Sequence, residues 1–209
     1  MKLYSYWRST TSYRVRIALN LKGLSYETVP VNLVKEEQSS EPYAALNPIR
    51  GVPTLVSDDG RAITQSIAIL DYLDQVAPEP ALLPTGDAFR RAHILAAAMV
   101  FATDVHPVNN LKVVKRVRSM SDEETTAAWM RHWMAEGFRA YDQLIDKTCQ
   151  FSFGCSPSLA DICLVAQAYN AHRWGVDLQP YPRITEIEQR CLALPAFDAA
   201  RPENQKDAT

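Results

Sequence analysis

Short β-prone runs alternate with amphipathic helical stretches along the first eighty residues of the chain. The spacing of apolar positions predicts strands over residues 2–6 and 26–31 and helices over 13–22 and 65–76, with a short helix at 41–46. Strands that alternate with helices are typical of an α/β layer with parallel strand pairing.

Two further short apolar runs follow the second strand, at residues 54–57 and 61–63. The residues between them are Asp58-Asp59-Gly60, and an Asp-Gly pair between two short strands predicts a hairpin. The expected order of elements is therefore β-α-β-α-β-β-α, with one antiparallel hairpin beside the parallel strands.

The pattern becomes purely helical after a proline-rich connector at residues 77–81. We accordingly expect an α/β domain over residues 1–80 and an all-helical domain over 86–209, ending in a polar tail, 201–209, that frays. One wide apolar stripe recurs at four-residue steps and predicts the core of a helical bundle. The stripe consists of Trp129, Trp133, Gly137 and Tyr141, and the adjacent stripe that widens it consists of Met130, Met134, Phe138 and Ile145.

Composition narrows the possible classes of protein. The 209 residues carry a formal net charge of −2 and no basic block, so neither a nucleic acid nor a membrane surface is an expected partner. The longest apolar run, residues 95–102, is too short to span a bilayer, and no signal peptide is apparent. The four cysteines lack C-x-x-C spacing and the four histidines are scattered, which predicts free thiols in the cytoplasm and no metal site.

The first candidate site lies where the first strand meets the first helix. Arg8 and a cluster of hydroxyl side chains, Ser9-Thr10-Thr11-Ser12, lie at the N-terminus of that helix. Hydroxyls and unpaired N–H groups at a helix N-terminus suit an anion. No Gly-rich loop is present, so a thiolate is a better hypothesis than a nucleotide phosphate.

The second candidate site lies further along the same half of the chain. Val52-Pro53 precedes a strand, and a cis bond there would turn the Val52 backbone outward to pair with an extended peptide. Gln65 and Ser66 stand at the start of the next helix, where N–H donors suit a carboxylate. A thiol site, a backbone-pairing site and a carboxylate site on one wall together predict a small thiol peptide as ligand.

The string from Trp7 to Leu19, with its Arg-Ser-x-x-Ser-aromatic-Arg-Val-Arg-Ile-Ala-Leu pattern, resembles the zeta class of cytosolic glutathione transferases. The resemblance covers nearly the whole chain. It implies a thioredoxin-like α/β domain followed by an all-α domain, glutathione as cofactor, and a homodimer. It also implies cis–trans isomerisation of maleylacetoacetate, or alternatively of maleylpyruvate. Maleylacetoacetate isomerases commonly carry cysteine where this chain has Thr11, so the choice of substrate stays open.

The resemblance also implies roles for particular residues. Ser9 would activate the thiol, assisted by Thr10 and Thr11, and Arg8 and Arg173 would bind substrate carboxylates. From the residues alone, Ser9 and the two threonines are equally helix caps, and Arg173 suits a helix C-terminus before Gly175. Tyr6 is an alternative partner for the thiol.

Further glutathione contacts are expected on the same grounds. They fall on Gln38, Val52, Gln65, Ser66, His106, Asn109 and Asn110. A lone histidine before Pro107 is equally a structural residue, since a helix ends or kinks there. Two other functions stay open, namely a general glutathione transferase or peroxidase, and a non-catalytic glutathione-fold module that binds a protein.

Overall fold

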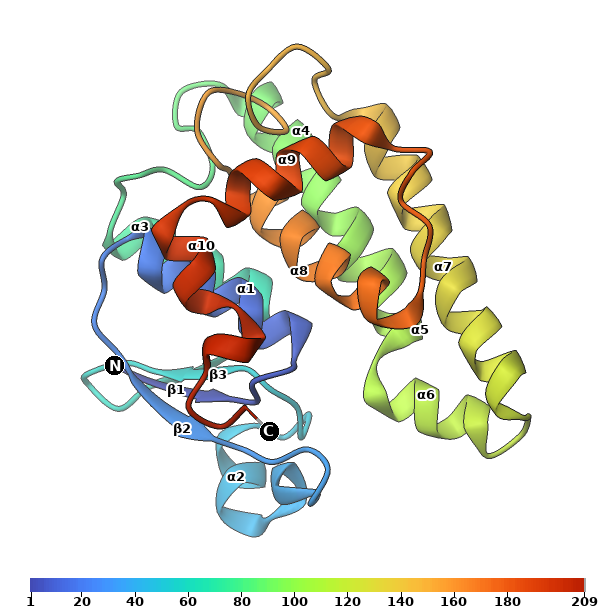
Figure 1. Ribbon diagram of the computed structural model, residues 1–209. Helices are drawn as coiled ribbons and strands as arrows, with labels where there is room; N and C mark the ends of the chain where they lie inside the picture. Colours follow the sequence, from blue (N-terminus) through green and yellow to red (C-terminus); the bar gives the residue numbers. More distant parts are fainter. Residues whose placement is uncertain (209) are drawn as a thin grey trace. The chain divides into compact units, whose positions relative to one another are not determined.

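The computed structural model describes residues 1–208, which form two compact units (Figure 1). The first unit comprises residues 1–82 together with residues 193–208, and the second comprises residues 83–192. The predicted helical domain ran from 86 to 209, whereas in the structure its last segment packs with the α/β unit.

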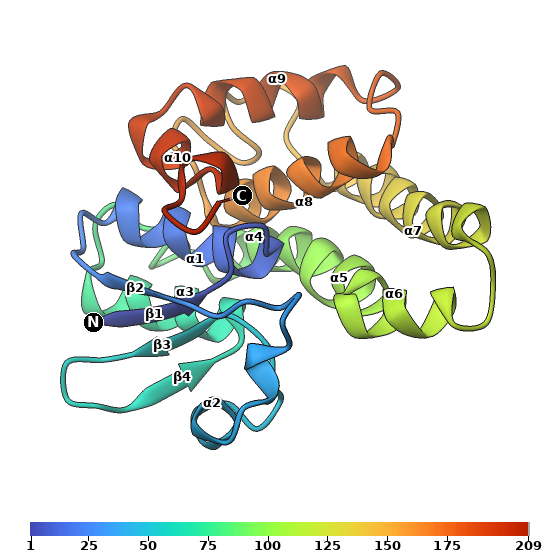
Figure 2. The same cartoon turned by 60° about the horizontal axis from the view of Figure 1, so that its bottom comes forward.

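The first unit is built on a four-stranded sheet with strand order β2-β1-β3-β4. Strand β1 is parallel to β2 and antiparallel to β3, and β3 and β4 form the predicted antiparallel hairpin (Figure 2). The predicted order of elements is confirmed. The elements are β1 (Lys2–Ser5), α1 (Thr10–Leu21), β2 (Glu27–Pro30), α2 (Glu41–Leu46), β3 (Thr54–Val56), β4 (Ala62–Thr64), α3 (Ser66–Val76) and α10 (Pro195–Ala200), with a 3₁₀ turn, η1, at Glu37–Ser39.

Helix α1 is buried on nearly all sides, including its charged residues. The guanidinium of Arg16 is fully buried and donates to the carbonyl of Ala200 at 3.0 Å, to Ser5 Oγ at 3.1 Å and to the carbonyl of Trp7 at 2.9 Å. Because these acceptors replace water, a buried charge is tolerated here. Arg16 thereby joins the first strand, the loop after it and the end of α10.

The C-terminal segment completes the first unit. Helix α10 lies across α1, where Asn20 Nδ2 donates to the carbonyl of Ala196 at 3.1 Å (Figure 2). The 3₁₀ turn η3 (Pro202–Asn204) follows, and Asp207 accepts a hydrogen bond from the Trp7 N–H at 3.0 Å. Residues 201–208 are therefore folded back on the unit and not frayed; Thr209 lies outside the described residues.

The proline-rich connector is held by a buried ion pair. Lys22 Nζ lies 2.9 Å from the Asp74 carboxylate and also donates to the carbonyls of Ala77 and Pro80. The same carboxylate accepts from the Leu82 N–H at 2.8 Å. These contacts fix the path of the chain as it leaves the first unit.

The second unit is helical. Its long helices α4, α7, α8 and α9 surround a core that includes Phe101, Phe138 and Tyr141, with ring centroids about 5 Å apart. No helix among residues 1–208 is long and apolar enough to cross a membrane. The elements are α4 (Ala88–Met99), the π-helix η2 (Val100–Val105), α5 (His106–Asn109), α6 (Leu111–Arg118), α7 (Glu123–Leu144), α8 (Leu159–Trp174) and α9 (Pro182–Leu192).

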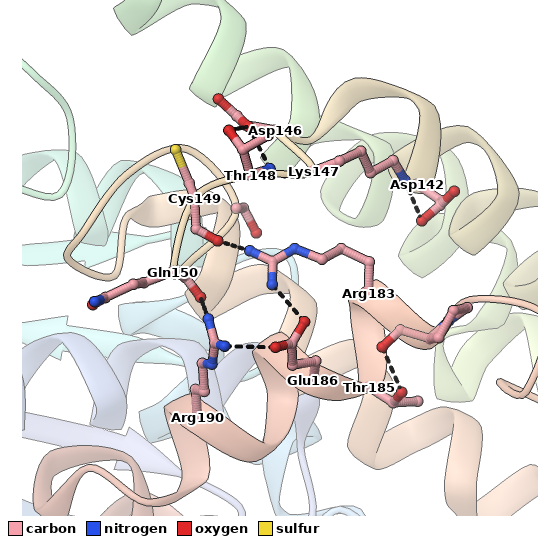
Figure 3. A network of polar contacts seen from close by, with 12 residues as sticks. Asp142, Asp146, Lys147, Thr148, Cys149, Gln150, Arg183, Thr185, Glu186 and Arg190 are labelled. Carbon is pink, nitrogen blue, oxygen red and sulfur yellow. Dashed lines mark hydrogen bonds and ion pairs between the residues drawn. The ribbon is translucent and has the colours of Figure 1, made fainter.

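The loop between α7 and α8 is fixed by arginines of α9. Arg183 donates to the carbonyl of Cys149, and Arg190 Nη1 donates to the carbonyl of Gln150 at 2.9 Å (Figure 3). Glu186 lies between the two guanidinium groups and pairs with both. These bonds satisfy backbone carbonyls of a loop that has no regular secondary structure of its own.

The adjacent stripe of Met130, Met134, Phe138 and Ile145 is buried at every position, as predicted for a bundle core, whereas the first stripe is buried only along its C-terminal half. Gly137 and Tyr141 are buried, whereas Trp129 is exposed. A Cβ on Gly137 would lie 2.2 Å from Val105 Cγ2, so the glycine lets α7 approach η2 closely. A hydrogen at this position is therefore a packing requirement.

We expect Gly137→Ala to destabilise the protein by about 1–3 kcal/mol, because overpacking outweighs the gain in helix propensity. Thermal unfolding followed by circular dichroism measures the change. Gly51→Ala is the matched control, since a Cβ there meets nothing within 4 Å. An unfolding midpoint that stays the same or rises in Gly137→Ala would contradict the packing argument.

Candidate functional site

Two of the groups predicted to form one wall of a site, the hydroxyl cluster and the Val52 backbone, meet at the start of α1. Ser9 Oγ lies 2.9 Å from Thr11 Oγ1, and Thr11 Oγ1 donates to the carbonyl of Val52 at 2.8 Å. Ser9 is also the N-cap of α1, since its Oγ accepts from the Ser12 N–H at 3.2 Å. Helix α1 therefore begins at Thr10, three residues earlier than predicted.

The hydroxyl protons of this cluster have defined directions. Thr11 has one hydroxyl proton, which it donates to Val52, so it accepts the proton of Ser9. Capping uses an acceptor lone pair of Ser9, so its proton stays on the donor side, directed at Thr11, and would turn to a thiolate when one binds. The capping role and the anion-binding role of Ser9 are thus compatible, because they use different parts of one hydroxyl.

The segment before β3 presents backbone groups beside this cluster. The Val52–Pro53 peptide bond is cis, as the sequence suggested. The carbonyl of Gly51 accepts from Asn47 Nδ2 at 2.8 Å and from the Tyr43 hydroxyl, which fixes the turn. Within residues 1–208, the Val52 N–H has no hydrogen-bond acceptor. This N–H is a donor that an extended ligand could use.

The start of α3 combines an unusual backbone with a buried hydroxyl. Gln65 is exposed and has φ +69°, a conformation that residues other than glycine seldom adopt and that clusters at functional sites. Ser66 is buried, and its Oγ accepts from Arg14 Nη1 at 3.4 Å. Helix α1 thus carries Ser9 at its start and supports Ser66 through Arg14.

Gln38 and Thr10 complete the candidates of the first unit. Gln38 lies in η1 and is the one half-buried residue between Val34 and Ser40 in a largely exposed segment. Its Oε1 is buried and has no hydrogen-bond partner among residues 1–208, which is the state expected of an atom that meets a ligand. Thr10 is the first residue of α1 and is buried.

Arg8 follows β1 and is half-buried. Its guanidinium carbon lies 5.3 Å from the centroid of the Trp7 ring, a cation–π distance that orients the side chain. Trp7 is in turn held by Asp207 through its backbone N–H. Tyr6, the alternative partner for a thiol, is buried with its ring 6.0 Å from that of Trp7.

The remaining candidates belong to the second unit. The π-helix η2 passes directly into α5, which begins at His106 with Pro107 in its first turn. Asn109 is buried, and its Oδ1 has no partner within residues 1–208. Asn110 caps α6, since its Oδ1 accepts from the Val113 N–H at 3.1 Å, so a structural role uses part of its amide.

Arg173 lies in the last turn of α8, just before Gly175, whose φ of +67° ends the helix. Its side chain is exposed, while Nη1 donates to Asn170 Oδ1 at 3.3 Å. Its guanidinium carbon lies 5.9 Å from the Tyr169 ring. Asn170 and Tyr169 were not among the predicted site residues; their spacing of three and four residues from Arg173 on one helix is the signal that could have identified them.

Comparison with known proteins gives one consistent match. Residues 1–75 match the family model described as glutathione S-transferase, N-terminal domain. Maleylacetoacetate isomerase of Pseudomonas aeruginosa is 46% identical over 210 residues, covering 99% of this chain and 98% of that protein.

Two solved structures extend the match to the fold. A bacterial zeta-class glutathione S-transferase, maleyl pyruvate isomerase in its holo form, is 43% identical with a TM-score of 0.96, covering 100% of both chains. Maleylacetoacetate isomerase from Methylobacterium extorquens AM1, solved with bound malonate and GSH, is 34% identical with a TM-score of 0.94, again covering 100% of both chains.

Proposed function

This chain belongs to the zeta class of the glutathione S-transferase family, and on that premise we propose that it is a glutathione-dependent cis–trans isomerase of maleylacetoacetate. The observation that carries the proposal is the Ser9–Thr11–Val52 arrangement at the start of α1, in a chain that matches isomerases over its full length. The predicted thioredoxin-like fold with a helical remainder agrees with this family.

The first task of the site is to hold a thiol as its anion. A thiol with a pKa of about 8.5 is only about 3% ionised at pH 7. Lowering that pKa by about 2 units needs about 2.7 kcal/mol of preference for the thiolate. The Ser9 hydroxyl would supply about 1.5–3 kcal/mol as a donor to a charged partner, and the α1 N-terminus about 0.3–1 kcal/mol. No metal or general base is needed.

The peptide backbone and the carboxylates of glutathione would be bound by polar groups of the candidate site. The open Val52 N–H would pair with the peptide backbone, and Gln65 and Ser66 at the start of α3 would bind a carboxylate. The buried Oε1 of Gln38 would accept from an N–H. On the strength of the resemblance, we assign further contacts to Thr10, Thr11, His106, Asn109 and Asn110.

Bound glutathione supplies a thiolate that adds reversibly to the cis double bond and so permits rotation about it. The protein's part is alignment and charge compensation. We propose that Arg8 and Arg173 each bind a substrate carboxylate, since a guanidinium makes two parallel hydrogen bonds to that group. Cationic and N–H donors would also stabilise the negative charge that develops on the carbonyl oxygen.

Several finer assignments follow from this reaction. We propose that the enzyme acts in aromatic amino acid catabolism, specifically tyrosine degradation, in the cytoplasm, and as a homodimer. Maleylpyruvate is the alternative substrate, and Thr11 in place of the cysteine common in maleylacetoacetate isomerases supports it. The isomerase named for maleyl pyruvate that matches the whole chain supports it as well.

The test is turnover of maleylacetoacetate and of maleylpyruvate by the purified protein, with and without glutathione. We expect the fumaryl product from at least one of them, only when glutathione is present, and the ratio of the two kcat/KM values assigns the substrate. If neither compound is isomerised, the proposed function is wrong.

A further inference from the structure

We propose that Asn170 is a positioning residue for Arg173, fixing the guanidinium in the orientation that binds a carboxylate. This inference rests on the proposed function in one respect, namely that Arg173 meets a carboxylate of the substrate. Asn170 itself would touch no substrate and would act through Arg173.

The two residues are adjacent on one face of α8 but differ in exposure. Arg173 is exposed, whereas Asn170 is 8% exposed and held within the helical unit. Asn170 Oδ1 accepts from Arg173 Nη1 at 3.3 Å, and Asn170 Nδ2 faces Met134 Sδ of α7 at 3.6 Å. The buried amide therefore reaches outward to a charged group at the end of the helix.

The inward contact of Asn170 does not account for its presence. A thioether is a weak acceptor, so the contact with Met134 contributes little to satisfying a buried amide. A hydrogen bond to a guanidinium is stronger than one between neutral groups. The better use of the Asn170 side chain is thus the one directed at Arg173.

A second restraint acts on the same guanidinium. The ring of Tyr169 lies 5.9 Å from the Arg173 guanidinium carbon, so an acceptor and an aromatic face limit its rotation together. The neighbouring His172 pairs through Nε2 with Glu188 of α9 at 3.0 Å, which fixes the end of α8 itself. An arginine side chain is otherwise costly to order, so a guanidinium that is oriented beforehand binds a carboxylate more tightly.

The experiment compares Asn170→Ala, Asn170→Leu, Arg173→Ala and the double variant Asn170→Leu/Arg173→Ala. Leucine removes the acceptor while keeping the side chain's volume, so it serves if the alanine variant is poorly folded. Calorimetric titration with malonate, a small dicarboxylate, measures carboxylate binding, and steady-state kinetics measures KM and kcat for the maleyl keto-acid.

We expect loss of the Asn170 acceptor to weaken malonate binding and to raise the substrate KM, each about three- to tenfold. The kcat and the KM for glutathione should stay within about twofold. In the Arg173→Ala background, the same loss should have almost no further effect, because the two residues act as one unit.

Gln167 provides the matched control. It is a fully buried amide one turn earlier on α8, with no hydrogen-bond partner within residues 1–208. Gln167→Leu should leave malonate affinity and the substrate KM unchanged.

Two results would overturn the positioning role. One is an equal loss from Asn170→Leu whether or not Arg173 is present. The other is malonate binding that does not respond to Asn170, or that the wild-type protein lacks. The malonate titration tests the positioning role of Asn170 without any turnover. It can therefore be interpreted even if the wild-type protein isomerises neither maleyl compound, which is the result that would show the proposed function to be wrong.

Discussion

Ser9→Ala is expected to lower kcat at pH 7 by up to about 25-fold while glutathione still binds. The variant lacks the hydroxyl proton that would otherwise meet the sulfur, so the preference for the thiolate falls by about 1.5–3 kcal/mol. Ultraviolet absorbance of the bound thiolate, followed against pH, should show the pKa of the thiol rising from about 6.5 toward its free value of about 8.5. Turnover at pH 7 should fall because less of the sulfur is ionised.

Two comparisons separate the donor role of Ser9 from its capping role. Ser9→Thr keeps both a cap and a hydroxyl and should restore most of the activity. Ser57→Ala removes a hydroxyl from the exposed hairpin, where it contacts Asp59 and Arg61, and should change nothing. If the thiol bound to Ser9→Ala were still ionised at neutral pH, the assignment of Ser9 would be wrong.

Replacing Arg8 and Arg173 together with alanine is expected to lower kcat/KM for the maleyl keto-acid about a thousandfold. Each guanidinium is proposed to bind one carboxylate, and two charge-assisted contacts of about 1.5–3 kcal/mol each give an effect of that size. Kinetics with the maleyl keto-acid measures the loss. The rate of glutathione conjugation to an uncharged halogenated electrophile, which has no carboxylate, should be little changed.

Exposed arginines provide the controls for the double variant. Arg61→Ala in the first unit and Arg139→Ala in the second break surface ion pairs with Asp59 and Glu136, which contribute little to stability. Neither should affect turnover. Full turnover of the maleyl keto-acid by the Arg8→Ala/Arg173→Ala variant would instead favour the general transferase or peroxidase.

Local signals in the sequence were sufficient for most of the first unit. The Asp-Gly turn predicted the β3–β4 hairpin, and the alternating pattern predicted the parallel β1–β2 pair. The hydroxyl cluster at residues 9–12 and Val52-Pro53 were predicted to belong to one site, and the hydrogen bond from Thr11 to the Val52 carbonyl brings them together. These predictions succeeded because turn chemistry and periodicity are properties of short segments.

Features that join distant segments could not be read in the same way. The bond from Arg16 to the Ala200 carbonyl spans 184 positions, and a backbone carbonyl has no signature in the sequence. The tail was expected to fray because its residues are polar, yet Asp207 meets the Trp7 N–H. Likewise, the sequence shows that Asn170 and Arg173 are three residues apart. It does not show that Asn170 is buried and Arg173 is exposed.

The return of residues 193–208 to the first unit has a consequence for how the protein is made. During translation the sheet and α1 leave the ribosome long before the segment that receives the guanidinium of Arg16 and the amide of Asn20. Domains generally fold in order from the N-terminus during synthesis. In this protein the first unit begins to emerge first, but it is complete only after residues 193–208 have been made. Helix α1 in the nascent chain therefore lacks these partners until residues 193–200 have been made, and deleting those residues would expose the buried guanidinium of Arg16 to water.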